Sequence, residues 1–190
     1  MIYFLIIACF IEIVLTNHEL DLIQSQFSKI TLKINGIGTK NILTSNNNFN
    51  SSYYPNIVYI NGVPQDTIKY SYYFNQTDNI VVLIWNNTIN YYKYMFNGCS
   101  YITEIDLSSF DSSNVINMTV MFRGCSKLSY INFTNFDTSK VTEIGSMFRE
   151  FPKLSSLDLS SFDTSNVIVL QMLKIWILCF LEFRIYYHNY

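Results

Sequence analysis

The stretch MFRGCSKLSYINFTNFDTSKV, residues 121–141, occurs three times in this chain with small changes. The other copies are MFNGCSYITEIDLSSFDSSNV, residues 95–115, and MFREFPKLSSLDLSSFDTSNV, residues 147–167, so the copies are spaced 26 residues apart. Self-similarity at a fixed spacing of about 20–50 residues is typical of stacked-repeat proteins, in which each unit buries its apolar edge against its neighbours. We therefore expect three stacked units over residues 91–170.

Each copy contains apolar residues that alternate with a polar one, as in Ile105-Asp106-Leu107. Alternation with a period of two predicts a short strand whose middle residue faces solvent. The three expected outward residues, one per repeat, are Asp106, Asn132 and Asp158. A row of such residues on one sheet face predicts a binding surface for a protein, with a merely solvated face as the alternative.

A Phe-Asp-Ser/Thr-Ser sequence follows each strand. Its aspartates are common turn formers and helix N-caps, and they are Asp111, Asp137 and Asp163. Behind the first of them, Val115, Met118, Met121 and Phe122 recur at the spacing of a helix face. The sequence thus predicts an α/β fold, a short solenoid of about three 26-residue strand-turn-helix repeats.

The section before the repeats, residues 17–90, predicts a β-rich N-terminal cap. KITLKI, residues 29–34, alternates like a half-buried strand, and NIVVLIW, residues 79–85, is typical of a buried strand. Asn61-Gly62 after an apolar run predicts a type I′ hairpin, and Pro64 restricts its second strand to the edge of a sheet.

The two ends of the chain are strongly apolar. Residues 1–16 are interpreted as a secretory signal peptide, with an uncleaved membrane anchor as the alternative. Residues 171–190 lose the repeat pattern. This tail is either a cap on the last repeat or a degenerate or truncated repeat, and Lys174 makes it a poor bilayer span.

The composition narrows the class of protein. With 49% hydrophobic and 17% aromatic residues the chain is expected to fold, and a net charge of −2 without a basic run argues against a nucleic-acid partner. The two histidines, His18 and His188, lie at opposite ends, so the sequence supports neither a catalytic triad nor a zinc cluster. We expect no enzyme and no cofactor.

The turn aspartates are also candidates for a metal site, because carboxylates one repeat apart could bind Ca²⁺. Backbone hydrogen bonds in the turns explain the same residues, so no metal is assigned. Cys99 and Cys125 take the same place in successive repeats, where the third copy has Phe151. The two cysteines therefore either occupy an apolar core position or form a disulfide between neighbouring repeats.

Five Asn-x-Ser/Thr sequons make the chain a candidate glycoprotein if it is secreted. They begin at Asn50, Asn75, Asn86, Asn117 and Asn132. In a chain so rich in asparagine, serine and threonine, sequons also arise by chance.

The sequence motifs MFRGCSKL, FDTS and LDLSSFDTSNV resemble the repeat of the BspA-type leucine-rich repeat surface proteins. The resemblance extends over residues 95 to about 170. The second repeat departs from that pattern at Ile144, and the third has Glu150-Phe151-Pro152 for Gly-Cys-Ser. The resemblance implies a secreted or cell-surface protein that mediates protein binding or adhesion, with a protein or glycan ligand. The alternatives are a membrane-anchored scaffold, held by residues 1–16 or the tail, and an inactive fragment of a longer repeat protein.

Overall fold

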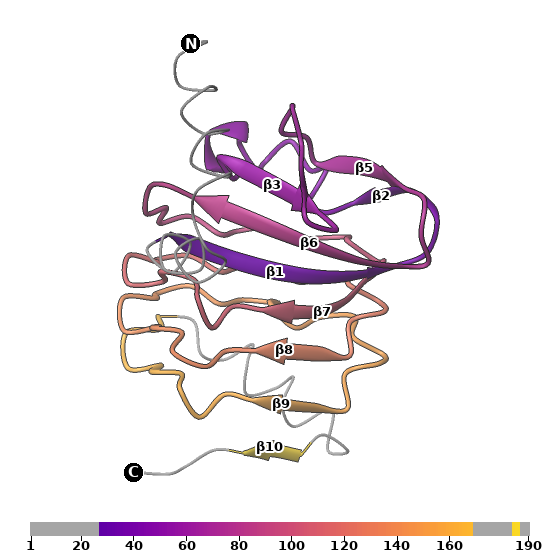
Figure 1. Cartoon of the computed structure of the whole chain (residues 1–190). Helices are drawn as coiled ribbons and strands as arrows, with labels where there is room; N and C mark the ends of the chain where they lie inside the picture. Colours follow the sequence, from indigo (N-terminus) through magenta and orange to yellow (C-terminus); the bar gives the residue numbers. More distant parts are fainter. Residues whose placement is uncertain (1–26, 169–183, 187–190) are drawn as a thin grey trace, which may run out of the picture.

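The computed structural model describes residues 27–168 and 184–186 of the chain. These residues form ten strands and one short 3-10 helix, η1 (Ser51–Tyr53), and they contain no α-helix (Figure 1). The strands are β1 (Ser28–Asn35), β2 (Gly38–Asn41), β3 (Ile57–Ile60), β4 (Val63–Pro64), β5 (Ser71–Phe74), β6 (Asp78–Trp85), β7 (Ile102–Asp106), β8 (Tyr130–Asn132), β9 (Ser156–Asp158) and β10 (Arg184–Tyr186).

The central feature is a six-stranded sheet of order β4-β3-β6-β1-β7-β8. Its N-terminal strands are antiparallel, and β1 and β6 pair over their full length from Ser28↔Trp85 to Asn35↔Asp78. β7 then pairs antiparallel with β1, and β8 pairs parallel with β7. The region expected to be a cap and the first two repeats therefore share one sheet, with β1 at the junction.

The predicted hairpin lies at the edge of this sheet. Asn61 and Gly62 have φ angles of 51° and 80°, as a type I′ turn requires, and Ile60 pairs with Val63 across the turn. Pro64 lies in β4, the edge strand, where its missing amide hydrogen costs no ladder hydrogen bond. The strand predictions at residues 29–34 and 79–85 are also correct, as β1 and β6.

Two smaller sheets complete the described residues. β2 and β5 pair antiparallel above the N-terminal end of the large sheet (Figure 1), and β9 and β10 pair parallel at the other end. β10 belongs to the apolar tail, whose other residues lie outside those described, as does the expected signal peptide at residues 1–16.

The prediction of an α/β leucine-rich-repeat solenoid with strand-turn-helix units is wrong, because the only regular elements in the described residues are β-strands and the short 3-10 helix η1. Residues expected to form helices form consecutive turns instead. Within them Tyr94, Val120 and Ser146 have φ angles of 69°, 61° and 54°. These left-handed conformations recur once per repeat and interrupt any right-handed helix.

Hydrogen bonds between repeats explain why the turns replace a helix. In an α-helix each amide donates to the carbonyl four residues earlier. Here the amides of Met118, Val120 and Gly124 donate instead to carbonyl oxygens of the next repeat, at 2.8, 2.9 and 3.1 Å. Their acceptors, each 25 residues later, are Glu143, Gly145 and Arg149. The intervening amides close local turns, as Met121 does on the Met118 carbonyl at 3.1 Å.

The core runs unbroken through these layers. The rings of Phe96, Phe122 and Phe148 stack in one column, with centroids 5.8 and 6.2 Å apart. A second column contains Phe110, Phe136 and Phe162, at 6.5 and 6.2 Å. Trp85 of β6 meets Phe110 edge to face at 5.4 Å, so the aromatic core of the repeats continues into the N-terminal region.

Candidate functional site

The outward side chains of β7, β8 and β9 form the surface that the repeat pattern predicts as a site. The register places Glu104 beside Tyr130 and Asp106 beside Asn132, while Ile105 and Ile131 between them are buried. Ser156 and Asp158 occupy the same places on β9, the strand below β8 in Figure 1. We call these six residues the outer strand face.

Two groups on this face were not expected from the sequence. The Lys33 ammonium of β1 lies 2.8 Å from the Glu104 carboxylate and extends the polar surface onto the neighbouring strand. Tyr130 has 52% of its surface exposed and is an aromatic side chain on an otherwise polar face. Its alternation with the buried Ile131 was the signal that could have placed it there.

Asp106, Asn132 and Asp158 also shape the backbone that follows each strand. Each accepts a hydrogen bond from the amide two residues later, from Ser108, Thr134 and Ser160, at 2.9, 3.0 and 2.9 Å. The Asn132 side-chain amide donates to the Asp106 carboxylate at 3.0 Å and links two repeats. The three side chains are therefore held in fixed positions along the face.

The turn aspartates have the same relation to the amide two residues later. Asp111, Asp137 and Asp163 accept from the amides of Ser113, Ser139 and Ser165 at 3.1, 2.8 and 2.8 Å, and turns rather than helices follow them. The Ser139 amide and hydroxyl lower the pKa of Asp137, and the Ser165 hydroxyl and amide lower that of Asp163. These carboxylates stabilise the turns in their ionised form.

A buried hydroxyl directly after each of the first two turn aspartates joins one repeat to the next. Thr138 Oγ1 accepts from the Asp163 amide at 2.7 Å and donates to the Asp163 carbonyl at 3.0 Å. Ser112 Oγ accepts from the Asp137 amide at 2.7 Å. In β1, Ser28 provides the equivalent acceptor for the Asp111 amide at 3.0 Å. The hydroxyl series thus begins in the N-terminal region.

The sequons differ in accessibility. Asn50, Asn75 and Asn86 are exposed. Asn117 is 8% exposed, and its Nδ2, the atom a glycan would occupy, donates to Glu143 at 2.8 Å. The Asn132 Nδ2 is engaged with Asp106. The fold therefore favours the first three as attachment sites.

Cys99 and Cys125 are free thiols with no exposed surface. Burial raises the pKa of both, that of Cys125 to about 12, and Cys125 Sγ donates to the Phe96 carbonyl at 3.1 Å. These thiols are core groups of low reactivity. The disulfide alternative does not apply to this structure.

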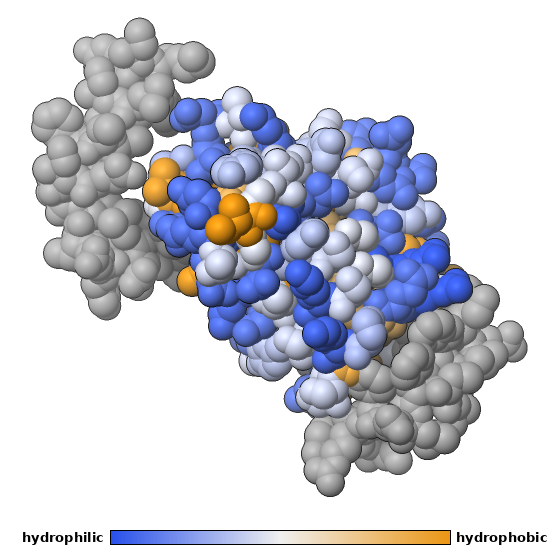
Figure 2. Space-filling model, turned by 90° about the vertical axis from the view of Figure 1, so that its right-hand side faces the viewer, coloured by the Kyte–Doolittle hydropathy of each residue, from blue (hydrophilic) through white to orange (hydrophobic). Residues whose placement is uncertain are grey.

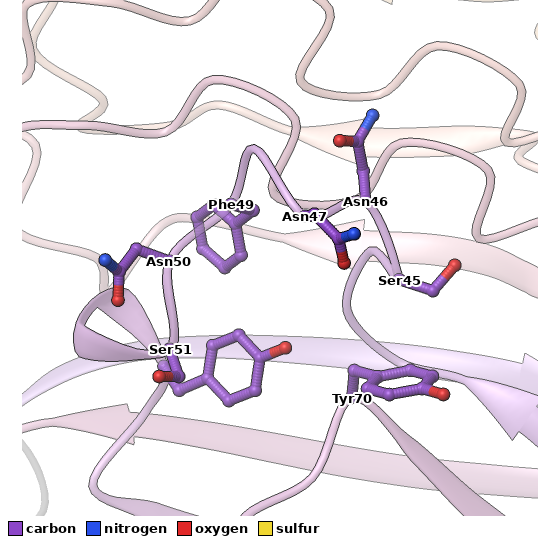
Figure 3. A pocket seen from close by; sticks show the side chains of 8 residues that line it. Ser45, Asn46, Asn47, Phe49, Asn50, Ser51 and Tyr70 are labelled. Atoms are coloured by element: carbon purple, nitrogen blue, oxygen red, sulfur yellow. The ribbon is translucent and has the colours of Figure 1, made fainter.

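A polar pocket of about 350 Å³ opens in the N-terminal region, around the loop that precedes η1 (Figure 3). Figure 3 shows Asn50 and Ser45 at the two sides of the opening, with Asn47 between them. Burial raises the pKa of Tyr54, and the neighbouring Tyr70 hydroxyl adds to the effect. No charged side chain lines the pocket, so it offers hydrogen bonds and ring faces rather than charge. Its lining residues are Ser45, Asn46, Asn47, Phe49, Asn50, Ser51, Tyr54 and Tyr70.

The described residues contain neither a metal-binding cluster nor a membrane-spanning helix. Residues 27–168 and 184–186 contain no group of three His, Cys, Asp or Glu side chains placed to hold a metal ion. Over the same residues, no helix has the length and apolar character needed to cross a bilayer.

Comparison with known proteins identifies one family. The family model described as "Mycoplasma protein of unknown function, DUF285" matches residues 69–175, which is more than half of the chain. The match includes all three repeats and the strands β5 and β6 before them. No curated protein and no solved structure matches the chain.

Proposed function

Since the chain belongs to the DUF285 family of Mycoplasma proteins of unknown function, we propose that it is a non-enzymatic, BspA-like surface protein that binds a protein partner through its outer strand face. Its location in this proposal is secreted or at the cell surface, and its activity is adhesion. The sequence motifs MFRGCSKL and FDTS support the BspA-like assignment.

The observation that carries the proposal is the composition of the outer strand face. An exposed aromatic ring, Tyr130, stands among carboxylates and an amide whose positions are fixed by hydrogen bonds. Tyrosine is enriched among the residues that dominate binding energy at protein interfaces. Ordered polar side chains around it lose little conformational freedom on binding, which favours affinity.

Binding rather than catalysis is the better interpretation of the titratable groups. The most strongly perturbed pKa values in the described residues belong to Tyr92, Cys99 and Cys125, and burial raises all three. Each is inaccessible to a substrate, with no exposed surface. We assign no catalytic residue, cofactor or metal, and no nucleic-acid partner.

Export is tested by expressing the full chain in a secretory eukaryotic host, followed by mass spectrometry of the N-terminus and of each sequon. We expect a new N-terminus near Asn17 and sugars on Asn50, Asn75 or Asn86, which are exposed. An intact Met1 with unmodified asparagines would favour the membrane-anchored scaffold and contradict secretion.

Adhesion is tested with beads coated with the protein, applied to cultured animal cells and to purified extracellular-matrix proteins. Tyr130→Ala should reduce adhesion at least about 10-fold, the loss expected for a central interface tyrosine. Tyr73→Ala is the matched control, because Tyr73 is 70% exposed on β5, outside the outer strand face. Equal losses in both variants, or adhesion no greater than that of uncoated beads, would refute the proposed site.

A further inference from the structure

Two lysine side chains converge on one tyrosine ring at the end of the molecule where β1 finishes and β7 begins. Lys40 Nζ lies 3.9 Å from the centroid of the Tyr101 ring, and Lys127 Nζ lies 4.4 Å from it. Tyr101 keeps 37% of its surface exposed. This end is on the right of Figure 1, and Figure 2, which faces it, shows a largely hydrophilic surface.

The fold brings these groups together from three separate parts of the chain. Lys40 belongs to β2, Tyr101 precedes β7, and Lys127 lies in the second repeat. The glycine turn after β1 packs behind them: a Cβ on Gly36, where φ is +104°, would lie 3.5 Å from Lys40 Cε and 3.9 Å from Tyr101 Cδ1. The lysine stem and the ring thus both lie beside this glycine turn.

The two positive charges have no carboxylate within ion-pair distance among residues 27–168. Carboxylates on the adjoining strands have other partners, since Glu104 pairs with Lys33 at 2.8 Å and Asp78 accepts from Asn35 at 3.1 Å. A tyrosine ring offsets only about 0.5–1 kcal/mol per exposed cation. Two ammonium groups held on one ring thus repel each other, and an anion that reaches both would relieve the repulsion.

One further positive charge lies in the next repeat. Lys153 takes the place of Lys127 one repeat later and is exposed. The stacking of the repeats therefore presents two cations, Lys127 and Lys153, at equivalent places in successive layers. A row of this kind fits a linear polymer that carries repeated negative groups. A flat lipid surface would instead require cations spread over a plane.

We propose that Lys40, Tyr101 and Lys127 form a binding site for the sulfate or carboxylate groups of an acidic polysaccharide. Each ammonium donates to an anionic oxygen, and the exposed Tyr101 side chain contributes its hydroxyl at the same place. Lys153 contacts the next acidic group of the polymer. The site is separate from the outer strand face and does not depend on the adhesion proposed for that face.

The test is binding of fluorescein-labelled heparin, a sulfated polysaccharide, to the full chain in 150 mM salt. The double variant Lys40→Gln/Lys127→Gln should raise the dissociation constant at least about 10-fold and flatten its salt dependence, because two ion contacts are lost. Lys69→Gln/Lys140→Gln removes the same charge elsewhere and should change the dissociation constant less than about 2-fold. Circular dichroism melting curves check that both double variants remain folded.

Three further measurements decide the chemistry of the site. Tyr101→Leu removes the ring and should weaken heparin binding. Unlabelled neutral dextran should not displace heparin. Equal losses in the two double variants, no heparin binding in 150 mM salt, or binding to phosphatidylserine vesicles in preference to heparin would each overturn the proposal.

Discussion

The N-terminal region, residues 28–85, and the repeats, residues 91–168, are both β-rich, but they are held together in different ways. β1 and β6 share an eight-residue antiparallel ladder, whereas β7 and β8 pair over only three residues. The repeats compensate with elements that recur in every layer, namely two columns of phenylalanine rings and buried hydroxyls that bond the next layer. The comparison teaches that short strands suffice where side chains supply equally regular contacts.

The largest expected effect comes from removing a ring from a column. Phe122→Ala should lower the free energy of unfolding by about 3–5 kcal/mol, because Phe122 is fully buried between Phe96 and Phe148. Leu83→Ala on β6 is the matched change in the N-terminal region and should cost about 2–5 kcal/mol. Urea denaturation followed by circular dichroism measures both.

The same experiment asks whether the two regions unfold together. β1 pairs with both β6 and β7, so we expect Trp85 fluorescence, recorded in a Trp176→Phe background, to change together with circular dichroism in each variant. A repeat transition that precedes the Trp85 transition in Phe122→Ala would show that the shared sheet does not couple them.

A smaller effect is expected from the hydroxyls between layers. Thr138→Val keeps the shape of the side chain but leaves the Asp163 amide and carbonyl without their partner, and should cost about 1–3 kcal/mol. Thr134→Val is the control, since Thr134 is exposed and its hydroxyl bonds only within its own turn. Comparable unfolding free energies for the two variants would mean that the buried hydroxyls are not a principal link between repeats.

The smallest effect concerns the ionised turn carboxylates. Hydrogen bonds from Ser139 lower the pKa of Asp137 in the folded protein, so its contribution is present above about pH 4 and is lost as the pH falls through the lowered pKa. Asp137→Asn cannot titrate, and the stability difference from wild type should narrow in acid by less than about 0.5 kcal/mol, since the group is exposed to solvent. Thermal melts from pH 2 to pH 7 test this, and a constant difference would argue against the lowered pKa.

The order of apolar and turn residues predicts the N-terminal strands well, because these strands are specified by residues that are neighbours in the sequence. Alternation at Ile30, Leu32 and Ile34 and the Asn61-Gly62 turn specify β1 and the β3–β4 hairpin without reference to distant residues. The helix prediction failed for the opposite reason. Met118 and Met121 are buried as expected, but the amide of Met118 bonds a carbonyl 25 residues away. Periodicity of side chains carries no information about that partner.

The candidate sites also differ in whether their determinants are local in the sequence. Alternation placed Asp106, Asn132 and Asp158 correctly on one face, because their position depends on neighbours in the same strand. The polar pocket and the contact of Lys40 and Lys127 with Tyr101 join segments from different parts of the chain. Such sites depend on the tertiary fold, and only the structure reveals them.

The 25-residue interval of the hydrogen bonds between repeats bears on how such a chain can change by mutation. A donor in one layer finds its acceptor only if the intervening chain keeps its length. An inserted or deleted residue changes the interval of each donor–acceptor pair that flanks it, whereas duplication or loss of a whole repeat preserves the pairing. Genes of this architecture are therefore expected to gain or lose length in complete units, by unequal recombination between their own copies.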